Sequence, residues 1–185
     1  VYKLDYNKVL EEHIKKGADI TIVCKDINPE EDDVSRFGIV KYNDDMQVVD
    51  FEEKPLVAQT STASIGVYVI RRRQLIELLE ACAKEGRTDF VRDILIRYKS
   101  VKKIYAYKMD SYWRNIGTID SYYKTNMDFL KKDIRDYFFR QYPDVYSKVE
   151  DLPPAKYNGD AVVNNSLIAS GCIINGTVEN SVLFK

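Results

Sequence analysis

The sequence predicts an α/β domain followed by the opening of a β-helix. Helical and strand patterns alternate through the first two thirds of the chain, an order typical of a sheet covered by helices. Near the end, aliphatic residues instead recur every six positions, which is typical of a β-helix whose hexads each form one side of a coil. We therefore expect an α/β domain over 1–132, a connector over 133–160 and the start of a β-helix over 161–185.

The composition excludes several classes of protein. The 28 Lys and Arg residues nearly balance the 29 Asp and Glu residues, so no overall field attracts nucleic acid or an anionic membrane. No apolar run reaches the roughly 20 residues that span a bilayer. Cys24, Cys82 and Cys172 lie far apart among apolar neighbours, and His13 is the single histidine. We expect a cytoplasmic protein with reduced cysteines and without a His/Cys zinc site.

The chain opens on a helix followed by a strand. Val9, Leu10 and Ile14 lie on one side of this helix, and Gly17 is suited to end it with a left-handed cap. The segment "DITIVCK" that follows is rich in β-branched residues, which indicates a buried strand.

A hairpin and a further strand come next. The acidic segment "INPEEDDVS" has no periodicity, so we expect a mobile loop. The residues from Gly38 to Tyr42 and from Gln47 to Phe51 predict two strands around the turn "NDDM". The segment "SIGVYVI" predicts another buried strand.

Two helices and a strand complete the α/β pattern. "QLIELLEACAKEG" and "TDFVRDILIRYK" are amphipathic, and "VKKIYAYKM" predicts a strand. Asp89 and Asp93 are four residues apart in the second helix, a spacing that favours a helix N-terminal charge and a solvated face over a catalytic pair. The expected inner faces carry Leu75, Leu78, Leu79 and Cys82 in the first helix and Phe90, Ile94 and Leu95 in the second.

The character of the chain changes after a last helix. Thr118 is suited to cap "IDSYYKTNMDFLKK". The connector holds three of the five prolines and has no sustained period, so we expect it to cross a surface. In the tail, the six-residue spacing joins Val162, Ile168 and Ile174, and separately Cys172 and Val178. Because a stable solenoid needs about three repeats, we expect this tail to continue or to be capped by a partner.

Seven segments follow one another in a characteristic order: "YKLDY", "SRFGIV", "VVDFEEKP", "ASIGVYVI", "TDFVRDIL", "YWRNIGTIDSYY" and the hexapeptide tail. Over the whole chain, they resemble the bacterial glucose-1-phosphate adenylyltransferase family. This family, the ADP-glucose pyrophosphorylases, converts ATP and glucose 1-phosphate to ADP-glucose and pyrophosphate in glycogen biosynthesis. The resemblance implies a nucleotidyltransferase domain with a Rossmann-like mixed sheet, whose N-terminal portion is missing here, and a left-handed parallel β-helix.

The resemblance also assigns a sugar-phosphate site. Glu53 would accept hydrogen bonds from glucose hydroxyls, and Lys54 would pair with the phosphate. Gly38 would let the backbone approach the sugar, while Ser64 and Tyr68 would line its pocket. Other interpretations stay open: an exposed Glu53–Lys54 ion pair, a bulge relieved at Gly38, and packing roles for Ser64 and Tyr68.

One position departs from the family pattern. Catalytic members resembling this chain place an aspartate that binds Mg²⁺ in the tryptophan turn, whereas "YWRNIGT" has Asn115 there. A neutral amide is a poorer ligand for a hard cation, so we expect Mg²⁺ binding to be weakened or lost. The family's other metal-binding aspartate would lie just upstream of Val1.

Asn115 makes the chain most similar to the GlgD-type partner subunit. We therefore expect poor activity alone, a catalytic adenylyltransferase subunit as partner, and a tetramer. The expected ligands are glucose 1-phosphate and ATP or ADP-glucose, with no nucleic acid or membrane partner. Two alternatives remain: another sugar-1-phosphate nucleotidyltransferase, and a purely non-enzymatic assembly module that senses a sugar phosphate.

Overall fold

The computed structural model describes residues 1–29 and 33–184 and divides the chain into two compact units. We call residues 5–110 the sheet unit, and residues 1–4 with 111–185 the tail unit. Residues 30–32, in the middle of the expected acidic loop, lie outside the described residues. Within the described ranges, no helix combines the length and apolar character needed to cross a bilayer.

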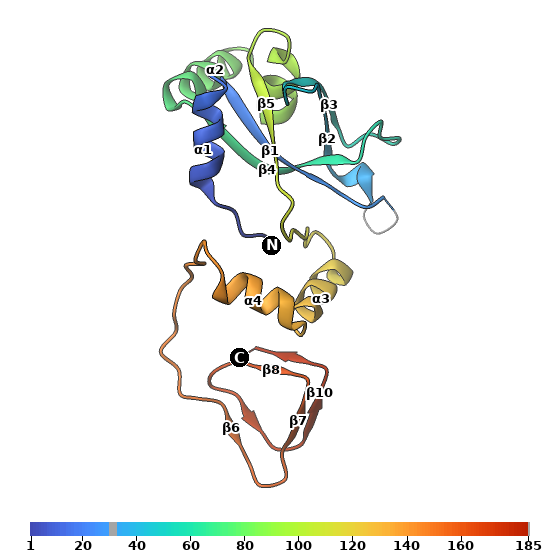
Figure 1. The fold of residues 1–185 in the computed structure, drawn as a ribbon, viewed down its shortest axis with the longest axis vertical. Coiled ribbons are helices and arrows are strands. Elements are labelled where there is room, and N and C mark those ends of the chain that lie inside the picture. The colour runs from blue at the N-terminus through green and yellow to red at the C-terminus, as the bar shows by residue number, and fades with distance from the viewer. Residues whose placement is uncertain (30–32, 185) are drawn as a thin grey trace. The chain divides into compact units, whose positions relative to one another are not determined.

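The sheet unit contains a mixed five-stranded sheet in the order β3-β2-β4-β1-β5 (Figure 1). β5 runs parallel to β1, and the other neighbouring strands run antiparallel. This arrangement confirms the expected α/β class, and the hairpin of β2 and β3 lies where the sequence predicts it. The strands are β1 Ile20–Asp26, β2 Gly38–Tyr42, β3 Val48–Glu53, β4 Thr62–Ile70 and β5 Ile104–Lys108.

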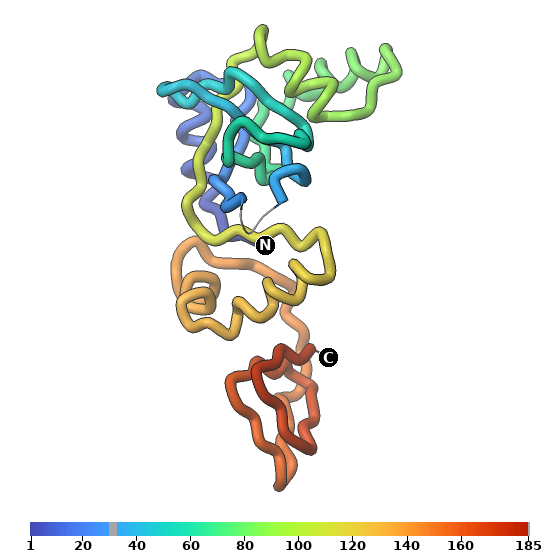
Figure 2. Tube along the Cα trace, turned by 90° about the vertical axis from the view of Figure 1, so that its right-hand side faces the viewer, coloured from blue at the N-terminus to red at the C-terminus, as the bar shows by residue number. Residues whose placement is uncertain are grey.

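Helices cover both faces of this sheet. Figure 2 shows α1 on one side and the segment of α2 and η2 on the other. Successive side chains of a strand point to opposite faces of the sheet, so β1 contacts both layers of helices. Ile22 and Cys24 belong to the core cluster with α2 and η2, whereas Thr21 faces α1. The helices are α1 Tyr6–Lys15, η1 Val34–Arg36 (a 3₁₀ turn), α2 Arg72–Lys84 and η2 Val91–Ile96, which is wound as a π-helix.

The buried face of α1 differs from the expected one. Leu10 and Ile14 are 45% and 68% exposed, whereas Val9 and His13 are buried. His13 Nδ1 lies 2.8 Å from Thr21 Oγ1, so a polar contact to β1 selects the face that the helix turns inward. Val9 and His13 are four positions apart and therefore lie on the same face of the helix. The pattern of apolar residues did not reveal this face because His13 is polar.

In the tail unit, the predicted cap of α3 is confirmed. The Thr118 hydroxyl accepts a hydrogen bond from the Ser121 N–H at 3.1 Å, and the Ser121 hydroxyl accepts one from the Thr118 N–H at 3.0 Å. This reciprocal capping box satisfies two amide donors at the start of α3, Ile119–Asp128.

A further helix, α4, occupies Lys132–Arg140 at the start of the expected connector. The sequence analysis expected a connector without a sustained period there and did not predict this helix. Phe138 is buried, and its ring centroid lies 5.1 Å from that of Phe129 and 5.5 Å from that of Tyr112. Aromatic packing against neighbouring segments therefore stabilises a helix too short for a sustained apolar period.

The end of the tail unit consists of six short strands that form three parallel pairs on successive sides of a coil (Figure 1). In two pairs the partners are fifteen residues apart, as with Val162 and Thr177, and in the third Lys156 pairs with Ile173. Three strict hexads would instead give a spacing of eighteen. The strands are β6 Lys156–Tyr157, β7 Val162–Asn164, β8 Leu167–Ile168, β9 Ile173–Ile174, β10 Thr177–Glu179 and β11 Val182–Leu183.

Asparagine residues stack at the corners of this coil. Asn165 and Asn180 both have left-handed backbone, with φ of 40° and 45°. The amide Nδ2 of Asn165 donates to Asn180 Oδ1 at 2.7 Å, so the two corners stack in register. Among the hexad residues, Ile174 is buried whereas Val162 is 54% exposed. The six-residue period thus placed four of its five residues in strands, all except Cys172, without identifying which positions pair.

Candidate sugar-phosphate site

The five predicted sugar-phosphate residues all lie in the sheet unit. Gly38 begins β2, Glu53 ends β3, and Lys54 follows it directly. Ser64 and Tyr68 lie in β4, which is next to β2 in the sheet. Residues that are up to 30 positions apart in the sequence are therefore brought to adjacent strands.

The strand registers align three of these residues across the sheet. Gly38 pairs with Glu53, and Ile39 pairs with Ala63, which places Gly38 beside Ser64 in the antiparallel ladder. Side chains that are opposite one another in adjacent strands lie on the same face. Glu53 and Ser64 therefore flank a position without a side chain.

A bulge in β4 adds Tyr68 to this group. Cys24 of β1 pairs with Ser64, but Val23 pairs with Val67, so two extra residues, including Gly66 at φ +78°, are accommodated. The bulge shortens β4 and brings the Tyr68 hydroxyl to 3.4 Å from Ser64 Oγ. The Gly66 N–H also donates to Ser64 Oγ at 3.3 Å.

Tyr68 also packs against a second aromatic ring. Its ring centroid lies 5.1 Å from that of Phe90, with 50° between the ring planes. Burial raises the pKa of Tyr68 above its usual value, and the charge of Glu53 acts in the same direction. The phenol is therefore a neutral hydrogen-bonding group near neutral pH, beside a buried Ser64 hydroxyl.

Gly38 has a packing reason for lacking a side chain. A Cβ there would lie 2.5 Å from Cζ of Phe51 and 3.2 Å from Oε2 of Glu53. The ring of Phe51 thus occupies the space next to Gly38 and packs into the core. Close approach of a sugar to this backbone stays a prediction.

Lys54 has a strained backbone. Its φ is +50°, a conformation that costs roughly 1–2 kcal/mol for a residue with a Cβ. Its N–H donates to the Phe37 carbonyl at 3.0 Å, and Pro55 follows it. Lys54 Nζ is 3.5 Å from Glu53 Oε1, with the side chains 64% and 29% exposed. Because an exposed pair of this kind contributes about 0–1 kcal/mol, the pair itself does not account for the strain.

Comparison of the sequence with known proteins identifies the family. A model of the nucleotidyl transferase family matches residues 1–132. The chain belongs to the nucleotidyl transferase family.

Its similarity to individual family members extends over the whole chain. It is 40% identical to a glucose-1-phosphate adenylyltransferase of Clostridium botulinum strain Alaska E43, covering 48% of that protein. It is 38% identical to the enzymes of that name from Bacillus subtilis strain 168 and Pseudothermotoga lettingae, covering 49% and 44% of them. The chain spans about half the length of these curated relatives. The resemblance indicated by the seven segments is thereby confirmed.

The tryptophan turn of this nucleotidyl transferase chain lies in the tail unit. Tyr2 forms an antiparallel bridge with Trp113, and the Arg114 N–H donates to the Val1 carbonyl at 2.9 Å. Asn115 follows directly and is exposed. These contacts hold the turn against the first residues of the chain.

The side chains present do not by themselves fit a Mg²⁺ site. Asn115 offers one neutral oxygen, whereas Mg²⁺ is usually bound through carboxylates. Within residues 1–29 and 33–184, no group of three or more His, Cys, Asp or Glu side chains is arranged to hold a metal ion.

A pocket that the sequence did not indicate lies between α1 and β5. Its volume is about 470 Å³, and Lys16, Met46 and Tyr105 are among the residues that line it. It contains none of the five predicted residues. Lysine and glutamate side chains from the exposed side of α1 contribute to its lining. Because any solvated helix carries such side chains, the sequence gives no sign of this pocket.

Proposed function

We propose that the chain is part of a glucose-1-phosphate adenylyltransferase subunit that acts in glycogen biosynthesis in the cytoplasm. The observation that carries this proposal is the row of Glu53, Gly38 and Ser64 across three strands, with Tyr68 and Lys54 at its sides. The identity of 38–40% over the whole chain to adenylyltransferases of that name supports it.

The arrangement suits a sugar phosphate. A carboxylate accepts hydrogen bonds from two hydroxyls, and the Ser64 and Tyr68 hydroxyls can each donate or accept. The exposed ammonium of Lys54 provides a point charge for the phosphate. In the reaction, an oxygen of this phosphate attacks the α-phosphorus of ATP and pyrophosphate leaves. Holding the sugar and neutralising its phosphate would position that nucleophile.

Asn115 supports a regulatory role beside a catalytic subunit. The antiparallel pairing of residues 1 and 2 with 114 and 113 runs toward Asn115, so a residue preceding Val1 would lie next to it. This is where the resemblance implies the second metal-binding aspartate. An amide opposite that position would weaken Mg²⁺ binding, so the subunit would turn over poorly alone.

The coil of the tail unit suits assembly. We interpret its three parallel pairs as the first coils of a left-handed β-helix, because stacked corners and parallel ladders are the features of a solenoid. The open end of a solenoid exposes strand edges that a partner can cover. The proposed assembly is a tetramer with a catalytic adenylyltransferase subunit.

Calorimetric titration of the full-length protein with glucose 1-phosphate tests the sugar site. Lys54→Ala keeps a Cβ and hence the same backbone strain, so it isolates the ammonium; we expect at least about ten-fold weaker binding. Lys15→Ala is the matched control, because Lys15 forms a similar exposed pair with Glu12 on α1. Equal affinities of wild type and Lys54→Ala would contradict the site.

An activity assay tests the regulatory role. The full-length protein alone should form ADP-glucose much more slowly than its mixture with a catalytic relative. Asn115→Asp should raise the activity of the lone subunit and its response to added Mg²⁺. A lone subunit as fast as the mixture would overturn the regulatory proposal while leaving the adenylyltransferase assignment intact.

Asn115 also favours a second candidate, a non-enzymatic assembly module that senses a sugar phosphate. Such a module would bind glucose 1-phosphate and alter a partner without any turnover, even after Asn115→Asp. A related transferase for another nucleotide would instead be revealed by turnover with a thymidine or guanosine triphosphate in place of ATP.

A further inference from the structure

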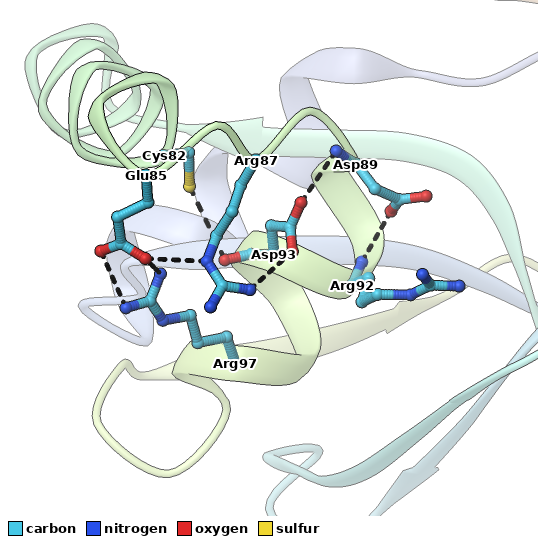
Figure 3. A network of polar contacts seen from close by, with 7 residues as sticks. All are labelled: Cys82, Glu85, Arg87, Asp89, Arg92, Asp93 and Arg97. Atoms are coloured by element: carbon cyan, nitrogen blue, oxygen red, sulfur yellow. Dashed lines mark hydrogen bonds and ion pairs between the residues drawn. The ribbon is translucent and has the colours of Figure 1, made fainter.

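A network of charged side chains joins the end of α2 to both ends of η2 (Figure 3). Arg87 lies between two carboxylates: its Nε donates to Glu85 Oε2 at 2.7 Å and its Nη1 to Asp93 Oδ1 at 3.3 Å. Arg97, just after η2, donates to both oxygens of Glu85 at 2.7 and 3.0 Å. Such bidentate pairs fix orientation as well as distance.

Asp93 is the inner member of this network. The sequence placed it on a solvated face, but it is only 7% exposed, and its Oδ2 accepts the Asp89 N–H at 2.9 Å. This hydrogen bond, together with Arg87, holds the pKa of Asp93 below its usual value. Asp89 in turn accepts the Arg92 N–H at 2.8 Å. The first turn of η2 is thus fixed by two interlocking carboxylates.

Phe90 lies inside that turn, between Asp89 and the π-wound residues. Its ring packs on Tyr68, whose hydroxyl lies beside Ser64. Ile94 and Leu95 are each 1% exposed and already hold η2 against the sheet. Apolar burial does not favour one orientation of the helix over another, because the hydrophobic effect is not directional. Hydrogen bonds to a carboxylate are directional and therefore fix the rotation of the turn. The network therefore restricts how the turn that carries Phe90 can rotate.

We propose that Asp93 is a positioning residue for the sugar site. It holds the start of η2 so that Phe90 supports Tyr68, and the Tyr68 hydroxyl stays next to Ser64, where it meets the sugar. The inference rests on the proposed function, because it assigns Asp93 to the same site. Asp93 itself touches no substrate and acts through Phe90 and Tyr68.

Glucose 1-phosphate titrations of full-length variants test the proposal. Asp93→Ala should weaken binding by about 3- to 30-fold, the range of residues that act through a packed neighbour. Asp93→Asn keeps an oxygen for the Asp89 N–H but loses the charge that faces Arg87, so its loss should be smaller and still measurable. Glu77→Ala is the matched control, because Glu77 pairs with Arg73 at the exposed side of α2. It should bind as the wild type does.

A double-mutant cycle with Phe90→Leu separates positioning from general loss of stability. If Asp93 acts through Phe90, Asp93→Asn should add almost no further loss of affinity in the Phe90→Leu background. A merely structural role predicts that the two losses add. Near-ultraviolet circular dichroism should show that each variant retains its tertiary packing, and Asp93→Asn decides the test if Asp93→Ala does not fold.

The outcomes distinguish the two proposals. Unchanged affinity in Asp93→Asn, or additive losses in the cycle, would overturn the positioning role while Lys54→Ala still shows the sugar site. Absence of glucose 1-phosphate binding by the wild type would overturn both.

Discussion

At the scale of single residues, the candidate site depends on the position that lacks a side chain. Gly38 stands between Glu53 and Ser64 in the row across the sheet, and the Phe51 ring fills the space beside it. The lack of a side chain at Gly38 therefore leaves room for the Phe51 ring and, in the proposed function, for the approach of the sugar. Adding a side chain at this position should therefore affect both core packing and sugar binding.

Gly38→Ala should lower the free energy of unfolding by about 1–3 kcal/mol, because the added Cβ would lie 2.5 Å from the Phe51 ring. Urea unfolding followed by circular dichroism measures the loss. Gly159→Ala is the control, since a Cβ there meets nothing within 4 Å. An equal effect of the two substitutions would show that the Phe51 ring can move away at little cost.

His13 makes stability depend on pH. Burial, and next the charge of Arg71, lower the pKa of His13 below its usual value of about 6.5. Its Nε2 is buried without a partner among the described residues. The unfolded chain therefore binds a proton at a higher pH than the folded chain, and the free energy of unfolding should fall as pH decreases from about 6.5 toward the folded pKa.

The pH dependence of urea unfolding between pH 7.5 and pH 5, values chosen to bracket about 6.5, measures this effect. His13 is the single histidine, so His13→Asn should flatten the slope in that window. A slope that persists in the variant would assign the pH dependence to other titrating groups instead.

At the scale of elements, local sequence patterns predicted whether a segment is a helix or a strand. They did not predict which face of a helix is buried or, beyond the hairpin of β2 and β3, which strands pair. The cap at Thr118 is local: hydroxyl, backbone and Ser121 lie within four residues. The inward face of α1 depends instead on Thr21, which belongs to another element. Asp93, expected on a solvated face, is instead buried, and its carboxylate accepts hydrogen bonds from the Asp89 N–H and the Arg87 guanidinium in the π-wound turn.

Thr118→Ala should destabilise the start of α3 by about 1 kcal/mol, because the Ser121 N–H loses its acceptor. Hydrogen exchange of the amides in the first turn of α3 measures this locally, without assuming that the two units unfold together. Ser121→Ala removes the reciprocal hydroxyl and should have a comparable effect that is not additive with the first. Unchanged protection in Thr118→Ala would mean that tertiary packing alone holds this turn.

At the scale of the whole molecule, the tail unit exposes large apolar side chains. Ile173 and Phe184 are 63% and 64% exposed on the short strands and the chain end. Exposed apolar surface beside open strand edges is typical of a solenoid that continues or is covered. In the proposed tetramer, this surface would be buried between segments or subunits.

Ile173→Asp should shift the proposed assembly toward smaller species, because burying the new charge would be costly. Analytical ultracentrifugation of the full-length protein mixed with its catalytic partner measures the shift. Val101→Asp, at a 74% exposed position of the sheet unit, is the control. An unchanged assembly in Ile173→Asp would place the contacts elsewhere.

The sequence by itself determined the order and kind of most elements and the family, and the family resemblance named the five residues of the candidate site, whose role stays a prediction. These follow from short-range patterns and from motifs in order, which need no knowledge of distant partners. Only the tertiary structure decided that Glu53, Gly38 and Ser64 form one row and that a bulge brings Tyr68 to them. It also decided that the partners in two of the three coil pairs are fifteen residues apart. Strand register, burial and bulges arise from contacts between segments that are remote in the chain. A local sequence pattern does not indicate which remote segment will pack against it.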